Sequence, residues 1–237
     1  MTGRCGNSLP KMSAIPSCAL LIFAKAPAAG RVKTRLVPPL TYRQAADLYR
    51  CMLLDTLAAT ENLSNVSRFI FLAGDHADMD EFRLHAPDAR ILPQEGDDLG
   101  ERLARAFGAV FDAGFRSACV IGTDMPHLPA ERIGEAFGLL ESSGADAVFG
   151  PTDDGGYYLL AMNGMHRQLF ADVPWSSGQT LATSLARAAA AGLGTELLPG
   201  CFDLDTIEDI RRLASLPATG EAVRTRAFIA GCAGLTG

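Results

Sequence analysis

The sequence predicts an α/β protein whose mainly parallel sheet is covered by helices on both faces. Short continuous apolar runs, typical of buried parallel strands, alternate with segments whose apolar residues recur at helical spacing. Neither an internal repeat nor a long linker divides the 237 residues. We therefore expect a single domain at 18–237. Residues 1–17 are rich in Gly, Ser, Asn and Pro and predict a flexible N-terminal extension.

The first elements are a strand, a loop and a helix. The apolar run 19–23 predicts the strand, and a loop rich in Pro, Gly and basic residues follows at 25–40. Thr41 and Gln44 then form a capping-box pattern, which predicts that a helix begins there. The apolar residues behind it recur at the spacing of one helix face.

The later elements continue the alternation. Further strands are expected at 68–72, 118–121, 146–149 and 157–161. Further helices are expected around 99–110, 133–140, 178–191 and 210–213. The strand at 157–161 follows its neighbour after a polar turn, which suggests an antiparallel insertion. Asp205 and Glu208 form a second capping pattern ahead of the last helix.

Composition narrows the functional classes. Hydrophobic residues make up 48% of the chain and charged residues 20%, and the formal net charge is -6. Nucleic-acid binding usually needs an extended basic surface, so we expect no nucleic-acid partner. A local basic pocket remains compatible with this balance, because net charge does not describe a cleft.

The N-terminal run and the cysteines indicate the compartment. The apolar run 18–24 loosely resembles the core of a secretory signal, but Lys25 interrupts the small-residue site at which such a signal would be cleaved. No apolar stretch approaches the roughly 20 residues of a membrane span. The six cysteines include no Cys-x-x-Cys pair, which favours small buried hydrophobes in a reducing compartment. We expect a cytoplasmic protein without membrane contact, either a monomer or a homodimer.

Polar clusters that follow the predicted strands are the candidate functional residues, since ligands of open α/β sheets bind beyond the carboxyl ends of the strands. The first cluster follows the first strand. Its small residues, including Gly30, let backbone N–H groups approach phosphates, and its positive charges come from Lys25, Arg31, Lys33 and Arg35. The pattern is not a P-loop. Spacing alone favours a phosphate site and a solvated basic loop about equally.

The second and third clusters follow later strands. Asp124, in Gly-Thr-Asp, lies where a strand ends and suits a hard cation, although a turn or helix cap would use the same residue. The segment 150–158 contains Asp154, Gly155, Gly156 and Tyr157. Paired glycines permit close approach to a ligand, and a tyrosine can stack on a sugar or base. The competing interpretation is a tight turn between two strands.

Three smaller features complete the candidate site. Asp203 and Asp205 share one face of an extended chain and could supply further metal carboxylates, unless Asp205 caps the next helix. Trp175, beside Ser176, fits either an acceptor pocket or the core. The histidines show no ligand spacing, and we expect His127 to be a surface or helix-start residue.

Taken in order, these stretches resemble a bacterial family of GT-A-type transferases, often described as arsenosugar-biosynthesis or radical-SAM-associated glycosyltransferases. The family is itself similar to nucleotidyltransferases of the phospholactate guanylyltransferase kind. The resemblance runs from about residue 19 to 214. The matching text is Phe23–Pro27, Gly30–Leu36, Asp98–Leu103, Gly122–Pro126, Gly150–Pro151, Asp154–Tyr158, Trp175–Ser176 and Asp203–Thr206.

The resemblance implies a single-domain nucleotide-diphospho-sugar transferase fold of the GT-A, Rossmann-like type. It implies that donor phosphates bind the loop 25–35, and that the turn 154–157 faces the second substrate. It also implies that Mg²⁺ or Mn²⁺ binds Asp124, Asp203 and Asp205. One departure is the missing Asp-x-Asp, since Gly122 and Thr123 precede Asp124.

Three functions follow as hypotheses. The first is a glycosyltransferase that moves a sugar from a nucleoside-diphosphate sugar to a small acceptor, with Asp124, Lys33, Arg35 and Asp154 as catalytic residues. The second is a nucleotidyltransferase that couples a nucleoside triphosphate to a small phosphorylated or carboxylated acceptor and releases pyrophosphate. The third is a non-catalytic nucleotide-binding protein, which the missing Asp-x-Asp favours.

Overall fold

The structure is a computed structural model that describes residues 17–74, 79–232 and 235. The predicted N-terminal extension lies outside the described residues except for Ser17, so that prediction remains untested. Within the described residues, no helix is both long and apolar enough to span a membrane. The five described cysteines are free thiols, and Cys18 and Cys119 are buried as predicted.

The centre of the fold is one sheet, which has seven strands within the described residues and the order β3-β2-β1-β4-β6-β5-β7. The strands are β1 (Cys18–Lys25), β2 (Val66–Ala73), β3 (Arg90–Pro93), β4 (Ser117–Ile121), β5 (Ala147–Pro151), β6 (Tyr157–Met162) and β7 (Thr195–Leu197). Every neighbouring pair is parallel except those of β6, which runs antiparallel to β4 and β5. The mainly parallel sheet and its antiparallel insertion are confirmed.

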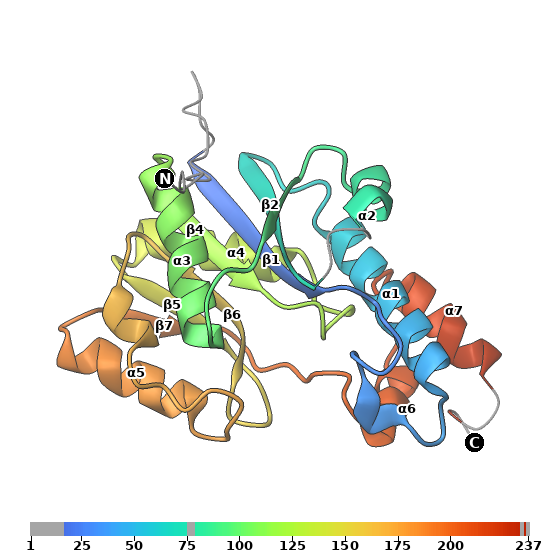
Figure 1. Cartoon of the computed structure of the whole chain (residues 1–237). Coiled ribbons are helices and arrows are strands. Elements are labelled where there is room, and N and C mark those ends of the chain that lie inside the picture. The colour runs from blue at the N-terminus through green and yellow to red at the C-terminus, as the bar shows by residue number, and fades with distance from the viewer. Residues whose placement is uncertain (1–16, 75–78, 233–234, 236–237) are drawn as a thin grey trace, which may run out of the picture.

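Helices cover both faces of this sheet (Figure 1). They are α1 (Tyr42–Ala59), α2 (Met79–His85), α3 (Leu99–Asp112), α4 (Glu131–Ser142), α5 (Thr180–Ala190), α6 (Ile207–Ser215) and α7 (Val223–Gly231), with short 3-10 helices η1 (Thr34–Leu36) and η3 (Arg167–Phe170). Alternate strand residues face opposite layers, as the pleat requires. Leu20 and Ile22 pack with α1 and α4, whereas Leu21 and Phe69 pack with α3 and α5.

A third apolar cluster joins the loop after β1 to the C-terminal helices. It contains Leu36 of η1, Leu48 of α1, Leu204, Ile210 of α6 and Ile229 of α7, all of them buried. Burial of large aliphatic side chains contributes about 1.5–3 kcal/mol each. The cluster therefore fixes residues 33–36 and 203–205, which are far apart in the sequence, against the same helix.

Of the two capping patterns predicted from the sequence, the structure contains one. The capping box of Thr41 and Gln44 is present at the start of α1, as predicted. The prediction that Asp205 and Glu208 cap the last helix is wrong, because Thr206 is the N-cap of α6 and Asp209 completes its capping box. The true pair lies one residue further along, and the side chain of Asp205 is available for other contacts.

Four elements were not predicted from the sequence: β3, β7, α2 and α7. The four residues of β3 are only half-buried, and the three residues of β7 are exposed, so neither strand carries a continuous apolar run. Strands this short are recognised by their pairing, β3 beside β2 and β7 beside β5. Tertiary pairing of this kind leaves little trace in local sequence.

Candidate functional site

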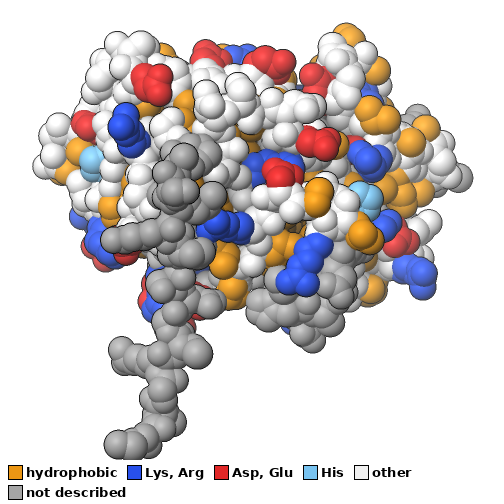
Figure 2. All heavy atoms as spheres, turned by 90° about the horizontal axis from the view of Figure 1, so that it is seen from above, with side chains coloured by type: hydrophobic (Ala, Val, Ile, Leu, Met, Phe, Trp, Pro, Cys, Tyr) orange, Lys and Arg blue, Asp and Glu red, His pale blue; other side chains and the backbone are white. Residues whose placement is uncertain are grey.

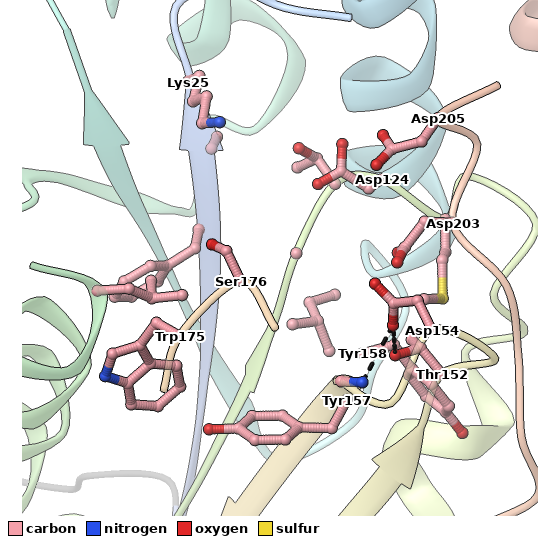
Figure 3. Close-up of a pocket in the computed structure, with 18 of the residues that line it drawn as sticks. Lys25, Asp124, Thr152, Asp154, Tyr157, Tyr158, Trp175, Ser176, Asp203 and Asp205 are labelled. Carbon is pink, nitrogen blue, oxygen red and sulfur yellow. Dashed lines mark hydrogen bonds between the residues drawn. The ribbon is translucent and has the colours of Figure 1, made fainter. Parts of the chain in front are cut away.

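A cavity of about 620 Å³ opens at the carboxyl ends of β1 and β4. This is where the strand order reverses, because β2 and β3 lie on one side of β1 and β4 on the other. Ligands of open α/β sheets bind at such a position. Figure 3 shows the acidic side chains of the cavity on one side, with Trp175 and Tyr157 on the other and Lys25 at the end of β1.

Lys33 is the buried centre of the charged side. Its neighbour Val32 is buried against α1, and Leu36 is buried in the third cluster, so the loop is pinned on either side of it. Lys33 Nζ lies 2.6 Å from Asp124 Oδ1 and 2.9 Å from Asp205 Oδ1, and its side chain is only 3% exposed. The backbone of Lys33 is left-handed, with φ 48°. A non-glycine residue in this region is strained by roughly 1–2 kcal/mol.

The charges of this cluster perturb one another. Burial alone would lower the pKa of Lys33, but Asp124 and Asp205 raise it well above its usual value. Burial alone would raise the pKa of Asp124, but the ammonium of Lys33 holds it below its ordinary range. Burial raises the pKa of Asp203 to about 7, with the negative charges of Asp124 and Asp205 adding to the effect. The three carboxylates outnumber the cations paired with them, which are Lys33 and Arg35, whose Nη1 lies 3.8 Å from Asp205 Oδ2.

Asp124 is held by a small hydrogen-bond network. Tyr49 of α1 accepts a hydrogen bond from the backbone N–H of Lys25 (2.8 Å), and its hydroxyl lies 2.7 Å from Thr123 Oγ1. Both Tyr49 and Thr123 are buried. The Asp124 carbonyl accepts a hydrogen bond from the N–H of Leu204 (2.9 Å). Because Leu204 is fully buried, its neighbours Asp203 and Asp205 are carried to the cavity wall.

Asp154 lies in the turn between β5 and β6. Its Oδ1 accepts hydrogen bonds from Thr152 Oγ1 (2.5 Å) and from the N–H of Gly156 (3.0 Å), which Figure 3 marks. Gly155 has φ +86°, and a Cβ there would lie 2.2 Å from the carbonyl oxygen of Gly178. Gly155 is therefore required by the turn and by close packing, as the turn interpretation of this segment proposes.

Trp175 lies on the aromatic side of the cavity. Trp175 lines the cavity and also packs on the cluster beneath α3, with its ring 6.3 Å from that of Tyr157. A Cβ on Gly100 would lie 2.5 Å from Trp175 Nε1, so the glycine at the start of α3 makes room for the indole. Tyr157 also lines the cavity, and burial raises the pKa of its phenol. Ser176 is exposed at the rim.

Most of the predicted site residues lie around this one cavity. Those that line it are Lys25, Arg31, Lys33, Arg35, Asp124, Asp154, Gly156, Tyr157, Trp175, Ser176, Asp203 and Asp205. Gly30 and Gly155 are absent from its lining; Gly30 has φ +78° in the turn of the first loop. His127 is corrected: it is half-buried rather than a surface residue, with its ring 4.4 Å from that of Phe202. Its imidazole lies 3.4 Å from Cys201 Sγ, and burial lowers its pKa to about 4.

The candidate metal ligands are the carboxylates of Asp124, Asp203 and Asp205. Within the described ranges, no three His, Cys, Asp or Glu side chains converge closely enough to hold an ion. Asp124 and Asp205 instead share the ammonium of Lys33. The chemistry nevertheless fits a hard cation, since the three carboxylates outnumber the cations paired with them and Mg²⁺ usually needs only one or two of them beside substrate phosphates.

Gln94 and Arg102 are among the polar cavity residues that were not predicted from the sequence. Gln94 follows β3 directly, and Arg102 lies in the first turns of α3. The rule that polar residues after strands form the site would have selected Gln94, but β3 was not recognised. Arg102 was part of the family resemblance without a role. Its Nε donates to the carbonyl of Gly96 (2.9 Å).

One face of the molecule carries charges of both signs. On the face shown in Figure 2, basic and acidic side chains of the described residues are interspersed rather than gathered into a patch of one sign.

Comparison with known families identifies the chain. A family model described as an uncharacterized protein conserved in bacteria (DUF2064) matches residues 56–177, just over half of the chain. The chain belongs to this family. No curated protein matches the DUF2064 chain.

Solved structures share its fold. A protein of Desulfovibrio desulfuricans, provisionally named a nucleotide-diphospho-sugar transferase, is 29% identical with a TM-score of 0.84, and the match covers 93% of this chain and 96% of that one. A cytidylyltransferase from Leptospira borgpetersenii is 14% identical with a TM-score of 0.58, over 91% and 94%. Glucosyl-3-phosphoglycerate synthase from Mycobacterium tuberculosis, in complex with Mn²⁺ and uridine diphosphate, is 12% identical with a TM-score of 0.50, over 78% and 70%. The predicted nucleotide-diphospho-sugar transferase fold is confirmed, and the comparisons support an enzyme of the transferase type.

Proposed function

We propose that this DUF2064 protein is a metal-dependent transferase that binds a nucleotide-activated donor and transfers part of it to a small acceptor. The observation that carries the proposal is the meeting of Asp124, Asp203 and Asp205 with Lys33 on the wall of one cavity. Carboxylates that outnumber the cations paired with them are suited to a divalent metal, and the basic loop beside them is suited to phosphates.

The donor phosphates would bind the loop after β1. Lys25, Arg31, Lys33 and Arg35 line the cavity and supply positive charge, and the turn at Gly30 shapes the loop. Lys33 is the best placed of them, because its loop is pinned on both sides by buried residues. A preorganised cation stabilises charge that develops on a phosphate without having to reorganise during the reaction.

Asp124, Asp203 and Asp205 would hold Mg²⁺ or Mn²⁺. When bound, the metal would neutralise the donor diphosphate and polarise its oxygens. The Mn²⁺ and uridine diphosphate of the Mycobacterium tuberculosis synthase agree with this pairing of metal and nucleotide. Tyr49 and Thr123 would keep Asp124 in place through the network that joins α1 to β4.

The acceptor would bind between the turn after β5 and the segment 175–176. Asp154 would take the proton of the acceptor hydroxyl at its carboxylate, which Thr152 and the backbone of Gly156 orient. Gly155 would shape this turn, and Gly156, Tyr157, Trp175 and Ser176 would form the wall against which the acceptor rests. Gly156 and Ser176 offer backbone and hydroxyl contacts, whereas the two aromatic rings offer a flat apolar surface.

We rank glycosyl transfer first, in line with the name of the Desulfovibrio relative. Nucleotidyl transfer is the second candidate. It is favoured by the cytidylyltransferase likeness in fold and by Gly122, which stands two residues before Asp124, where an Asp-x-Asp motif would have its first carboxylate. The link to arsenosugar biosynthesis stays a prediction.

The products of the reaction test the proposal. The protein would be incubated with Mn²⁺ and, in turn, with nucleoside-diphosphate sugars and nucleoside triphosphates, in the presence of pooled small hydroxylated and phosphorylated acceptors. Release of a nucleoside diphosphate supports glycosyl transfer, and release of pyrophosphate supports nucleotidyl transfer. Asp154→Asn should lower either rate by about 100-fold or more if the residue is the general base. Release of neither product from any donor would contradict the proposal.

A further inference from the structure

Gln94 is a cavity residue whose side chain is fixed by the sheet. It follows β3, and its backbone N–H donates to the carbonyl of Leu72 (3.0 Å), which extends the β2–β3 pairing by one residue. Its side-chain Nε2 donates to two backbone carbonyls, those of Ala24 in β1 (3.0 Å) and Phe71 in β2 (2.9 Å). The amide therefore spans the carboxyl ends of two parallel strands.

These two bonds determine which atom Gln94 presents to the cavity. A carbonyl oxygen only accepts hydrogen bonds, so the –NH₂ group must face Ala24 and Phe71, and the usual ambiguity between the two ends of the amide does not arise. Both hydrogens of Nε2 are used in this way. The opposite atom, Oε1, is left for the cavity that Gln94 lines. Turning the amide over would break both bonds, so Gln94 offers an acceptor and not a donor.

The surroundings of Gln94 suit a flat, largely apolar ring. Phe23, Leu99 and Leu103 line the same cavity as Gln94, and so does Arg102, whose guanidinium donates to the backbone carbonyl of Gly96. Small-molecule sites commonly combine apolar walls with a few fixed polar groups of this kind.

The position of Gln94 in the sheet separates it from the metal carboxylates. Gln94 lies on the β2 and β3 side of β1, whereas Asp124 follows β4 on the other side. A donor whose phosphates lie at the loop after β1 can therefore reach the metal carboxylates with one end and Gln94 with the other.

We propose that Gln94 Oε1 accepts a hydrogen bond from an N–H group of the donor's nucleobase and so discriminates against a base that lacks an N–H at that position. This inference rests on the proposed function, because it assumes a nucleotide donor. It assigns Gln94 to specificity, separate from the phosphate and metal residues. A base whose contacted N–H is replaced leaves Oε1 without its donor, and a site built for a hydrogen bond rejects such an analogue.

Paired nucleotides and paired variants test the assignment. The probes are the nucleoside triphosphate or nucleoside-diphosphate sugar that binds best and its analogue in which the base N–H group is replaced by C–H or N-methyl, both titrated calorimetrically with Mn²⁺. Wild-type protein should bind the analogue about tenfold more weakly. Gln94→Met removes the acceptor and should bind both nucleotides equally. Gln94→Glu also loses the Nε2 bonds but keeps an oxygen, and it should retain the preference.

The controls separate specificity from folding and from the proposed function. Inorganic pyrophosphate with Mn²⁺ probes only the charged side, and its affinity should be the same in wild type and Gln94→Met. If Gln94→Met discriminates between the paired nucleotides as wild type does, the assignment is wrong although nucleotide binding stands. If neither a nucleoside triphosphate nor a nucleoside-diphosphate sugar binds to wild type, both the assignment and the proposed function are contradicted.

Discussion

At the scale of single residues, Lys33 is the most constrained group of the site. Its side chain is almost fully buried and lies between Asp124 and Asp205. An ammonium in this position competes with any divalent cation for the same carboxylates. When phosphates bind, they give Lys33 an alternative to its two carboxylate partners, which frees these carboxylates for the metal. Nucleotide and metal should therefore favour each other's binding.

Lys33→Met should raise the affinity for Mn²⁺ in the absence of nucleotide and lower the affinity for nucleotide. The competing charge is lost in the first case and a phosphate ligand in the second. We expect at least a fivefold change in each direction, the lower end of typical coupling between sites. Calorimetric titration measures both, with Arg187→Met, whose ion pair with Asp172 is remote, as control. Unchanged Mn²⁺ binding in Lys33→Met would show that Lys33 does not compete with the metal.

The raised pKa of Asp203 predicts that the stability of the fold depends on pH. Its pKa is about 7 in the folded protein, above the value of about 3.9 expected when unfolded. The folded state therefore holds the proton more tightly, and ionising Asp203 destabilises the fold as pH rises from about 4 to 7. Asp203→Asn should melt at a higher temperature than wild type at pH 8, and the difference should vanish near pH 4. A difference that is constant across this range would contradict the pKa shift.

Polar residues that follow predicted strands pointed to many residues of this cavity, but the sequence did not show which of them contact one another. Asp124 and the basic loop stand out because each follows a continuous apolar run. The pairing of Lys33 with Asp205, 172 residues apart, depends on a third cluster of buried residues that no local pattern reveals. Sequence spacing could therefore mark these residues as candidates, whereas their contact with each other is visible only in the folded structure.

At the scale of elements, short and half-exposed strands limited what the sequence predicts. Continuous apolar runs identified β1, β2 and β4 because both faces of those strands are buried. In contrast, β3 owes its place to pairing with β2. Missing β3 also meant missing Gln94, which follows it.

The cap of α6 tests the corrected start of that helix. Thr206→Ala should lower the free energy of unfolding by about 1 kcal/mol, because an N-terminal N–H group loses its side-chain acceptor. Glu208→Ala, at the position favoured by the sequence pattern, should change it by less than about 0.5 kcal/mol. Chemical denaturation measures both variants. Equal losses would mean that Thr206 is not the cap.

A substitution at Gly100 in α3 tests how the Trp175 indole packs against this helix. Gly100→Ala places a methyl group against Trp175 and should displace the indole, which shifts its fluorescence emission to longer wavelength as it gains water. Trp175 is the only tryptophan, so the signal reports this side chain alone. Gly108→Ala in the same helix is the matched control, since its Cβ meets only Arg167 at 3.9 Å. An unchanged spectrum in Gly100→Ala would show that the indole is seated differently.

At the scale of the whole molecule, one cavity collects chemistry from segments spread over the chain. The loop after β1, the end of β4, the turn after β5 and the segment before α6 meet where the strand order reverses. The order of elements predicted this architecture. The alternation of strands and helices sets the sheet, and the sheet sets where its polar ends converge.

Metal-dependent nucleotide binding tests the central claim most directly. Melting temperatures would be measured with nucleoside diphosphates, triphosphates and nucleotide sugars, each with and without Mg²⁺ or Mn²⁺. A ligand at 100 times its Kd adds about 2.7 kcal/mol of stability, so we expect a clear rise that requires the metal and is lost in Asp124→Asn. If no nucleotide raises the melting temperature, with or without metal, the cavity is not a nucleotide site and the account is wrong.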